Sequence, residues 1–222
     1  MLRSPVAIAL TLIGHLAVLV AAGWASGAML VDMAGPDGVV GLDRVVVSYV
    51  TDRRYAWLTT TLRYVTWLGT AFVLLPVTAV VGVAVRRRVG SWATMAHLGV
   101  TLGGAIVLHD VIKLLVARPR PHVGQLVATA TGLAFPSGHA TQIAAVTVTL
   151  AILGCAISGS RFRRVAAWCT TALLVLVGGV SRIYLGVHWP TDVVAGGALG
   201  ALWAVLTART LPPVGVLAKA TT

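Results

Sequence analysis

The amino-acid sequence predicts an all-α fold: a polytopic membrane bundle of six transmembrane helices, with a short amphipathic interfacial helix between the first two. Three observations predict this fold. Apolar residues make up 58% of the 222 residues, and charged residues only 10%. Soluble domains carry about 25% charged residues, so this chain has too few to cover a surface in water. Its mean hydropathy is +0.92, and its apolar residues gather in long stretches.

Six stretches are long enough to cross a bilayer. A helix needs about 20 apolar residues to cross roughly 30 Å of hydrocarbon, because backbone amides in lipid must bond within their own segment. The stretches, some of which qualify only with their flanks, are residues 6–27, 66–85, 91–116, 140–159, 165–180 and 189–208. No linker or change of composition divides them, so we expect a single integral membrane domain over residues 1–222.

The first stretch has an alternative interpretation. Residues 1–25 contain one arginine, an apolar run and small residues, which is the pattern of a cleaved signal peptide. The apolar run continues to residue 31, longer than such a peptide needs, and this favours a retained first span.

Between the first two spans, residues 42–55 have the pattern of an amphipathic helix. An apolar stripe recurs at helical spacing in Leu42, Val45, Val46, Tyr49 and Val50. The other side carries Asp43, Arg44, Thr51 and Asp52. The pattern predicts a helix in the outer interface, with Tyr55 and Trp57 as aromatic anchors. Two roles stay open: a connector that packs on the bundle, or a lip over a groove through which lipid enters.

Three pairs of glycines have the small-xxx-small spacing that lets membrane helices approach closely. The pairs are Gly23–Gly27, Gly99–Gly103 and Gly196–Gly200. They support a packed bundle.

The formal net charge of +11 also occurs in proteins that bind nucleic acid. Here the basic residues form short clusters between apolar runs, which is typical of cytoplasmic loops, so no nucleic-acid partner is expected. With the amino terminus inside, the inner segments carry no acid and the basic residues Arg3, Arg86, Arg87, Arg88, Arg161, Arg163, Arg164, Arg209 and Lys219. The positive-inside rule therefore predicts a multi-pass protein of the plasma (inner) membrane with both termini cytoplasmic.

Polar side chains in membrane segments are costly, so each is a functional candidate. They gather in three places, which contain Lys113 and Arg120, then Ser137, Gly138 and His139, and then Arg182, His188 and Asp192. In a six-span chain with its amino terminus inside, all three places emerge on the outer face. The three places can therefore meet at one membrane surface, although they are far apart in the sequence.

The combined charge of the three places suits a phosphate. Lys113, Arg120 and Arg182 supply cations, and the arginines add forked hydrogen bonding. The second place precedes a long apolar helix, whose first amides form an anion site. Gly138 lets an oxyanion approach the backbone, and the Ser137 hydroxyl either adds a donor or only caps the helix.

The histidines suit phosphoryl transfer. His188 and Asp192 are four residues apart, which allows the carboxylate to hold one imidazole nitrogen and leave the other free to attack. His139 remains as a second imidazole, suited to proton transfer.

The three places contain the patterns Lys-x6-Arg-Pro, Pro-Ser-Gly-His and Ser-Arg-x5-His-x3-Asp, in that order, over residues 113–192. Together they resemble the signature of the type 2 phosphatidic acid phosphatase superfamily, in its membrane lipid phosphatase branch. The resemblance implies an enzyme that hydrolyses a phosphomonoester or diphosphate of a lipid through a phosphohistidine intermediate. Candidate substrates are undecaprenyl diphosphate, phosphatidylglycerophosphate and phosphatidic acid, so the expected partners are a lipid phosphate and membrane lipids.

The resemblance also implies a role for each residue of the signature. His188 is the nucleophile, and Asp192 orients it. His139 protonates the leaving oxygen and then activates water. The residues that bind the phosphoryl oxygens are Lys113, Arg120, Ser137, Gly138 and Arg182. No metal or other cofactor is expected, because a two-metal phosphatase needs a cluster of carboxylate and histidine ligands and the family is metal-independent.

Three neighbouring residues are expected to play supporting parts. Arg118 is interpreted as a supporting cation or an interface residue. Asp110 is three residues before Lys113, a spacing that favours an ion pair on one helix face. Ser181 is interpreted as structural.

Three alternative functions stay open at this point. A lipid phosphotransferase uses the same histidine chemistry but passes the phosphoryl group to a lipid or sugar hydroxyl. A vanadium haloperoxidase holds vanadate with similar residues, although six apolar spans argue against it. A non-enzymatic lipid transporter or scaffold does not need the intact residue set.

Overall fold

The computed structural model describes residues 4–33, 38–122, 127–128 and 130–212. Within these ranges the chain is helical and has no strand. The helices are α1 (Pro5–Asp32), α2 (Gly38–Asp52), α3 (Ala56–Val65), the 3-10 helix η1 (Thr66–Gly69), α4 (Ala71–Val89), α5 (Ala93–Val116), α6 (Gly138–Ile157), α7 (Arg161–Tyr184) and α8 (Pro190–Thr210). Arg3 and Lys219, which the charge argument used, lie outside the described residues.

Five helices, α1, α5, α6, α7 and α8, are each long and apolar enough to cross a membrane. A sixth crossing exists only if α3–η1 and α4, which meet at a bend of 51°, form one span. The predicted start of the second span at residue 66 is wrong. Thr70 has extended backbone and its hydroxyl accepts a hydrogen bond from the Val73 amide, so it caps α4 and separates it from η1.

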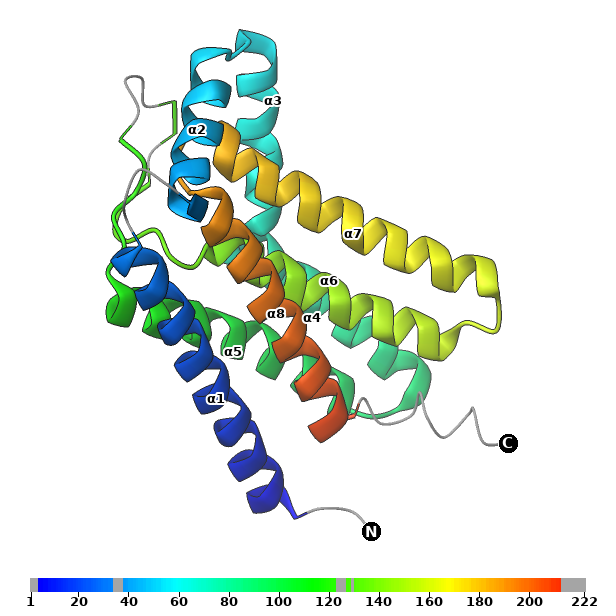
Figure 1. Ribbon diagram of the computed structural model, residues 1–222. Helices are drawn as coiled ribbons and strands as arrows, with labels where there is room; N and C mark the ends of the chain where they lie inside the picture. Colours follow the sequence, from blue (N-terminus) through cyan, green and yellow to red (C-terminus); the bar gives the residue numbers. More distant parts are fainter. Residues whose placement is uncertain (1–3, 34–37, 123–126, 129, 213–222) are drawn as a thin grey trace.

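Helix α6 is the centre of the bundle and packs on α8, α7 and α5 (Figure 1). Small residues bring α6 and α8 together. A Cβ at Gly196 would lie 2.6 Å from the Ser137 carbonyl oxygen, and one at Gly200 would overlap the Thr141 carbonyl oxygen. Side-chain volume at either position would therefore separate the two helices.

The other glycine pairs differ from one another. On α1, a Cβ at Gly27 would lie 2.6 Å from Val116 of α5, so the Gly23–Gly27 pair sits at a helix contact. Around Gly99 and Gly103 a Cβ would meet no atom within 4 Å. Of the three predicted pairs, two lie at helix contacts and the Gly99–Gly103 pair does not.

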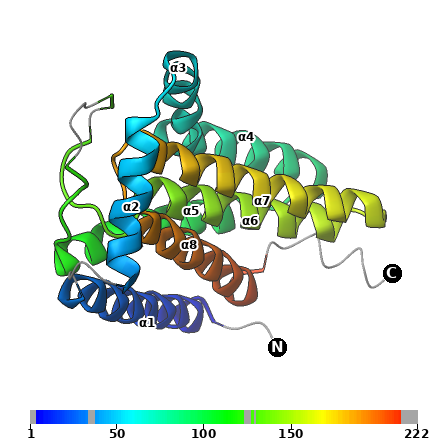
Figure 2. The same cartoon turned by 45° about the horizontal axis from the view of Figure 1, so that its top comes forward.

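Helix α2 crosses the end of the bundle and contacts α7 and α8 (Figure 2). A helix is present near the predicted residues 42–55, although it runs from Gly38 to Asp52, and the side assigned to Asp43 is wrong. Asp43 is 1% exposed and faces the protein, whereas Leu42, Val45 and Tyr49 of the predicted apolar stripe are exposed. The reason is that Arg118 and Thr191, on other segments, donate hydrogen bonds to the Asp43 carboxylate.

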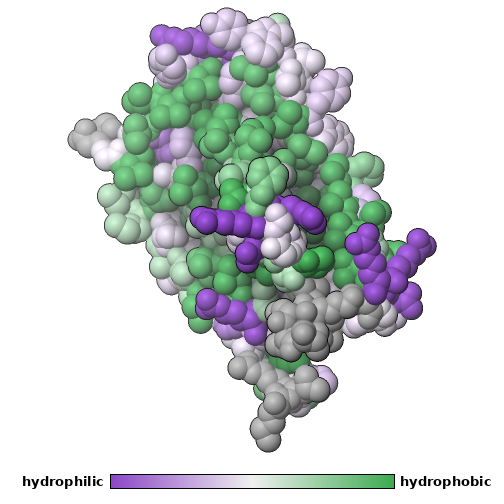
Figure 3. Space-filling model, turned by 90° about the vertical axis from the view of Figure 1, so that its right-hand side faces the viewer, coloured by the Kyte–Doolittle hydropathy of each residue, from purple (hydrophilic) through white to green (hydrophobic). Residues whose placement is uncertain are grey.

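The segments that connect the helices lie at two opposite ends of the bundle. The connections from α5 to α6 and from α7 to α8 meet at one end, and those from α4 to α5 and from α6 to α7 lie at the other (Figure 1). Figure 3 views the molecule from the side on which the α6–α7 connection lies. Hydrophilic side chains form separate groups there on a largely hydrophobic surface.

Candidate active site

The structure brings the three predicted places together at the end of the bundle near α2. His188 Nε2 lies 3.3 Å from Arg120 Nη1, and His188 Nδ1 lies 3.5 Å from Asp192 Oδ2. The Ser137 amide donates to the backbone carbonyl of Asp192 at 2.9 Å. The start of α6 is thus bonded directly to the start of α8, and the first place reaches the third through Arg120.

The turn between α7 and α8 sets the position of His188. Gly186 has a φ of 72°, a left-handed conformation that favours glycine, and it turns the chain at the end of α7. Pro190 then begins α8. The Asp192 carboxylate accepts a hydrogen bond from the Trp189 amide at 2.9 Å, which caps the helix and aims the same carboxylate at His188.

The tautomer of His188 follows from its two neighbours. An arginine can only donate hydrogen bonds, so Nε2, which faces Arg120, carries the lone pair. Nδ1 then carries the proton and faces Asp192. Burial lowers the pKa of His188 well below its ordinary value of 6.5, and the charges of Arg120, Arg182 and Lys113 lower it further. The imidazole is therefore neutral at neutral pH and stays neutral as the pH falls through 6.5.

Arg120 is fixed by backbone carbonyls. Its Nε donates to Gly132 at 3.0 Å and its Nη2 to Thr131 at 3.1 Å, while Nη1 donates to Val187 at 2.6 Å. These bonds connect the loop before α6 to the turn before α8. The guanidinium is therefore held beside His188 before any substrate arrives.

Besides His188 Nδ1, two buried donors next to the site have no hydrogen-bond partner among the described residues. The Ser137 hydroxyl makes no capping bond, although Ser137 is the residue that precedes α6. The capping alternative for Ser137 is therefore wrong. Arg182 donates through Nη1 to the Thr66 hydroxyl at 2.8 Å, but its Nε is unpaired. Because unpaired buried donors are rare in proteins, this pair indicates a place for an oxyanion.

Gly138 and Lys113 complete the predicted set. A Cβ at Gly138 would lie 3.0 Å from the His109 ring, so the backbone at this position is closely packed. Lys113 is half-buried in the last turn of α5, where its charge acts on His188.

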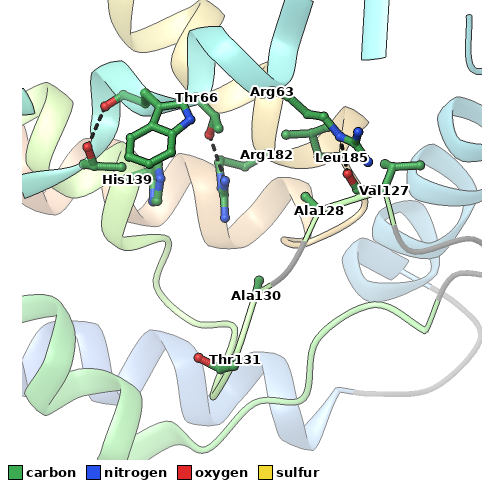
Figure 4. Close-up of a pocket in the computed structure, with 11 residues that line it drawn as sticks. Arg63, Thr66, Val127, Ala128, Ala130, Thr131, His139, Arg182 and Leu185 are labelled. Atoms are coloured by element: carbon green, nitrogen blue, oxygen red, sulfur yellow. Dashed lines mark hydrogen bonds between the residues drawn. The ribbon is translucent and has the colours of Figure 1, made fainter. Parts of the chain in front are cut away.

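A pocket of about 740 Å³ opens next to these donors, with His139 and Arg182 in its wall (Figure 4). Its other walls are the α3–η1 segment and the loop before α6. A Cβ at Gly69 would lie 3.0 Å from His139 Cβ, so the bend between η1 and α4 brings this wall against His139. Arg63, Thr66 and Trp67 line the pocket and were not predicted; Thr66 and Trp67 fall at the start of a predicted span, and Arg63 lies just before it.

Two expectations about supporting residues have clear outcomes. Asp110 pairs with His109 Nδ1 at 3.0 Å, and no ion pair between Asp110 and Lys113 occurs in the described part of the chain. Ser181 donates to the Gly178 carbonyl at 2.6 Å inside α7, a bond within the helix that agrees with the structural interpretation. The described residues contain no group of three His, Cys, Asp or Glu side chains that could hold a metal ion.

Arg118 is the main residue that sequence reasoning underestimated. It is 4% exposed and lies between two buried carboxylates, Asp192 at 2.6 Å and Asp43 at 2.8 Å. A signal for it was present in the sequence. Arg118 is one of only two arginines in the loop after α5, and the other, Arg120, belongs to the signature.

Comparison with known proteins identifies the family. The model of the PAP2 superfamily matches residues 94–214, which is more than half of the chain and includes every residue of the predicted signature. The chain belongs to the PAP2 superfamily. The resemblance inferred from the three sequence patterns is therefore confirmed.

Relatives of this PAP2 protein include phosphatidylglycerophosphatase B of Bacillus subtilis, 32% identical over 151 residues that cover 67% of this chain and 73% of the relative. The undecaprenyl-diphosphatase of Sulfolobus acidocaldarius is 27% identical over 179 residues, covering 77% and 79%. A crystal structure of a transmembrane PAP2-type phosphatidylglycerolphosphate phosphatase from Bacillus subtilis matches with a TM-score of 0.73 and 25% identity, covering 86% of this chain and 94% of that chain.

Proposed function

We propose that this PAP2 protein is a membrane lipid phosphatase that passes the phosphoryl group of its substrate to His188 and then to water. The predicted class of enzyme, a lipid phosphate hydrolase, is confirmed by its relatives. The observation that carries the mechanism is the state of His188. It is 2% exposed, with Nε2 next to Arg120 and Nδ1 directed at Asp192.

In the first step the phosphoryl oxygens bind to Lys113, Arg120 and Arg182, to the Ser137 hydroxyl and to the backbone at Gly138. His188 Nε2 attacks phosphorus, the P–N bond forms, and the bond from phosphorus to the leaving oxygen breaks. His139 takes up a proton as the anionic phosphate binds beside it and gives that proton to the leaving oxygen. Most of the rate enhancement comes from positioning and charge stabilisation, as is general for phosphoryl transfer.

In the second step water hydrolyses the phosphohistidine. His139, now neutral, takes a proton from the attacking water while the new P–O bond forms and the P–N bond breaks. His188 returns to its neutral form, and inorganic phosphate leaves. Asp192 keeps the proton of His188 on Nδ1 throughout, so Nε2 is available again for the next substrate.

An apolar crevice of about 160 Å³ supports a lipid as the substrate. It lies between α4, α6 and α7 and is lined by Ile143 and Gly178. Ile143 is one helical turn from His139 on α6, and Gly178 is one turn from Arg182 on α7. The crevice therefore lies directly below the phosphate pocket, where the first carbons of a hydrocarbon chain fit.

The mechanism is tested with purified protein in detergent and lipids labelled in the terminal phosphate. The panel contains undecaprenyl diphosphate, phosphatidylglycerophosphate and phosphatidic acid, with glycerol phosphate as the control without a hydrocarbon chain. We expect release of labelled phosphate from lipids and a labelled phosphoenzyme that is labile in acid and stable in alkali. Vanadate, a phosphate mimic, should inhibit, and a chelator should not.

Other outcomes would contradict this mechanism. Label that ends on a second lipid would indicate a phosphotransferase. Strong inhibition by the chelator would indicate a metal-dependent enzyme, and halide oxidation with bound vanadate would indicate a haloperoxidase. If glycerol phosphate were hydrolysed as fast as the lipid phosphates, the crevice would not bind a hydrocarbon chain of the substrate.

We also propose that both termini face the cytoplasm of a plasma membrane and that the active site faces outward. The arginine clusters of α4 and α7 support this orientation, because they lie at the end of the bundle opposite the site. In a chain with Cys155→Ser and Cys169→Ser, His122→Cys should react with an impermeant thiol reagent added to intact cells. Arg87→Cys should react only after the cells are opened, and the reverse pattern would invert the orientation.

A further inference from the structure

The site contains a buried ionic chain that begins at Asp192 of the PAP2 signature and continues through two residues outside it. Asp43 of α2 is 1% exposed, Arg118 is 4% exposed, and Asp192 of α8 is fully buried. Arg118 Nη1 donates to Asp192 Oδ1 at 2.6 Å, and Nη2 donates to Asp43 Oδ2 at 2.8 Å. One guanidinium thus holds two carboxylates from helices that are remote in the sequence.

Thr191 closes this chain into a network. Its amide donates to Asp43 Oδ1 at 3.0 Å, and its hydroxyl donates to Asp43 Oδ2. The same hydroxyl accepts a hydrogen bond from Arg118 Nη1 at 2.7 Å. Because a hydroxyl has one proton and two lone pairs, these bonds are compatible, and the first turn of α8 is fixed against α2.

The two oxygens of Asp192 have different partners. Oδ1 faces Arg118, whereas Oδ2 accepts from the Trp189 amide and faces His188 Nδ1. With both oxygens held, the carboxylate cannot rotate about its axis. Arg118 therefore determines where Oδ2 points, and Oδ2 determines the orientation of the His188 ring.

Stability does not explain this network. Replacing a buried ion pair by well-packed apolar side chains is often neutral or stabilising, and charges inside a membrane protein are costly and usually functional. An apolar pair would attach α2 to the bundle equally well. The turn after α2 is in any case attached separately, because the Tyr184 hydroxyl accepts from the Tyr55 amide at 2.8 Å.

We infer that Arg118 and Asp43 are positioning residues for the reaction: they fix Asp192 so that it holds His188 in line with the phosphorus atom. The inference rests on the proposed role of His188 as the nucleophile. It makes α2 a part of the catalytic apparatus, although this helix contributes no residue of the signature.

The test compares Asp43→Asn, Arg118→Gln and Arg118→Lys with the wild type in phosphate release from a lipid phosphate in detergent. Asp43→Asn keeps the shape of the side chain and should lower kcat about 10- to 100-fold, by analogy with the partners that orient metal ligands. KM should change less than about 2-fold, because these residues do not contact the phosphate. Arg118→Lys should fall between Arg118→Gln and the wild type, since lysine keeps the charge but not the fork.

A matched control is Asp52→Asn, which makes the same change on an exposed position of the same helix. It should leave kcat and KM at wild-type values. The unfolding temperature in detergent is measured for each variant. Asp43→Asn should remain folded at the assay temperature, so that its lower kcat reports the reaction.

A double-mutant cycle separates positioning from a general structural role. In an Asp192→Asn background, adding Asp43→Asn should lower kcat by less than about 2-fold, because the carboxylate it positions is already lost. Independent losses that multiply would overturn the inference, as would a wild-type kcat in Asp43→Asn. These results leave the proposed function intact as long as the wild type forms the phosphoenzyme, whereas a wild type that never forms it defeats the mechanism itself.

Discussion

Substitution of His188 by alanine is expected to lower phosphate release from a lipid phosphate by at least about 10,000-fold. The imidazole is the proposed nucleophile, and loss of a covalent nucleophile removes the intermediate altogether. The lysine, the arginines and the Ser137 hydroxyl still bind the phosphate, so KM should change far less than kcat. The measurement is phosphate release and phosphoenzyme trapping with the labelled lipids.

Two other histidines provide controls for this result. His122 is exposed in the loop after α5, and His122→Ala should keep the wild-type rate. His139→Ala should still form the phosphoenzyme from a substrate with a good leaving group, because proton donation matters least there, but should hydrolyse it slowly. More than about one per cent of the wild-type rate in folded His188→Ala would mean that another group is the nucleophile.

The second large effect is expected on folding, at the contact between α6 and α8. In Gly200→Ala the added methyl group would overlap the Thr141 carbonyl oxygen and lie 2.9 Å from the Thr141 carbonyl carbon. These are backbone atoms of α6, so the clash is relieved only if the two helices separate. We expect a loss of about 3 kcal/mol or more in the free energy of unfolding. Turnover should fall as well, because Ser137 begins one of these helices and Asp192 lies at the start of the other.

The matched control is Gly99→Ala in α5, where the added carbon meets no atom within 4 Å. This variant should unfold within about 0.5 kcal/mol of the wild type. The comparison is made by thermal unfolding in one detergent, with the fraction of folded protein after purification as a second measure. Equal stability of the two variants would show that α6 and α8 are not in close contact.

Sequence alone predicted five of the spans and the meeting of the signature residues because both depend on local or topological rules. Apolar length identifies a crossing, and the order of crossings puts the connections that follow the third and fifth spans on the same face. His188, Arg120 and Asp192 meet for this reason, although Arg120 precedes His188 by 68 residues.

Other features depend on contacts that no local pattern contains. The break at Thr66–Gly69 follows from the packing of Gly69 against His139, in a stretch that otherwise has the composition of a span. Asp43 lies next to Leu42 on a helix whose pattern places it toward water. What decides its burial is Arg118, 75 residues further along the chain.

The Ser137 hydroxyl presents a third kind of difficulty. Serine at this position suits both a helix cap and an anion ligand, and the sequence does not distinguish the two. The structure distinguishes them, because the Ser137 amide donates to the Asp192 carbonyl while the Ser137 hydroxyl makes no capping bond and is left unpaired.

The bond between the Ser137 amide and the Asp192 carbonyl joins main-chain atoms. Only a proline at position 137 would remove its donor. Most substitutions therefore leave unchanged the distance between the start of α6 and the start of α8, which carries His188 before it. The pocket wall at Arg63 and Trp67 consists of side chains, so a substitution there changes the wall directly. Substitutions in this wall can therefore change which lipid headgroup fits, while the main-chain bond that positions the reacting residues stays the same.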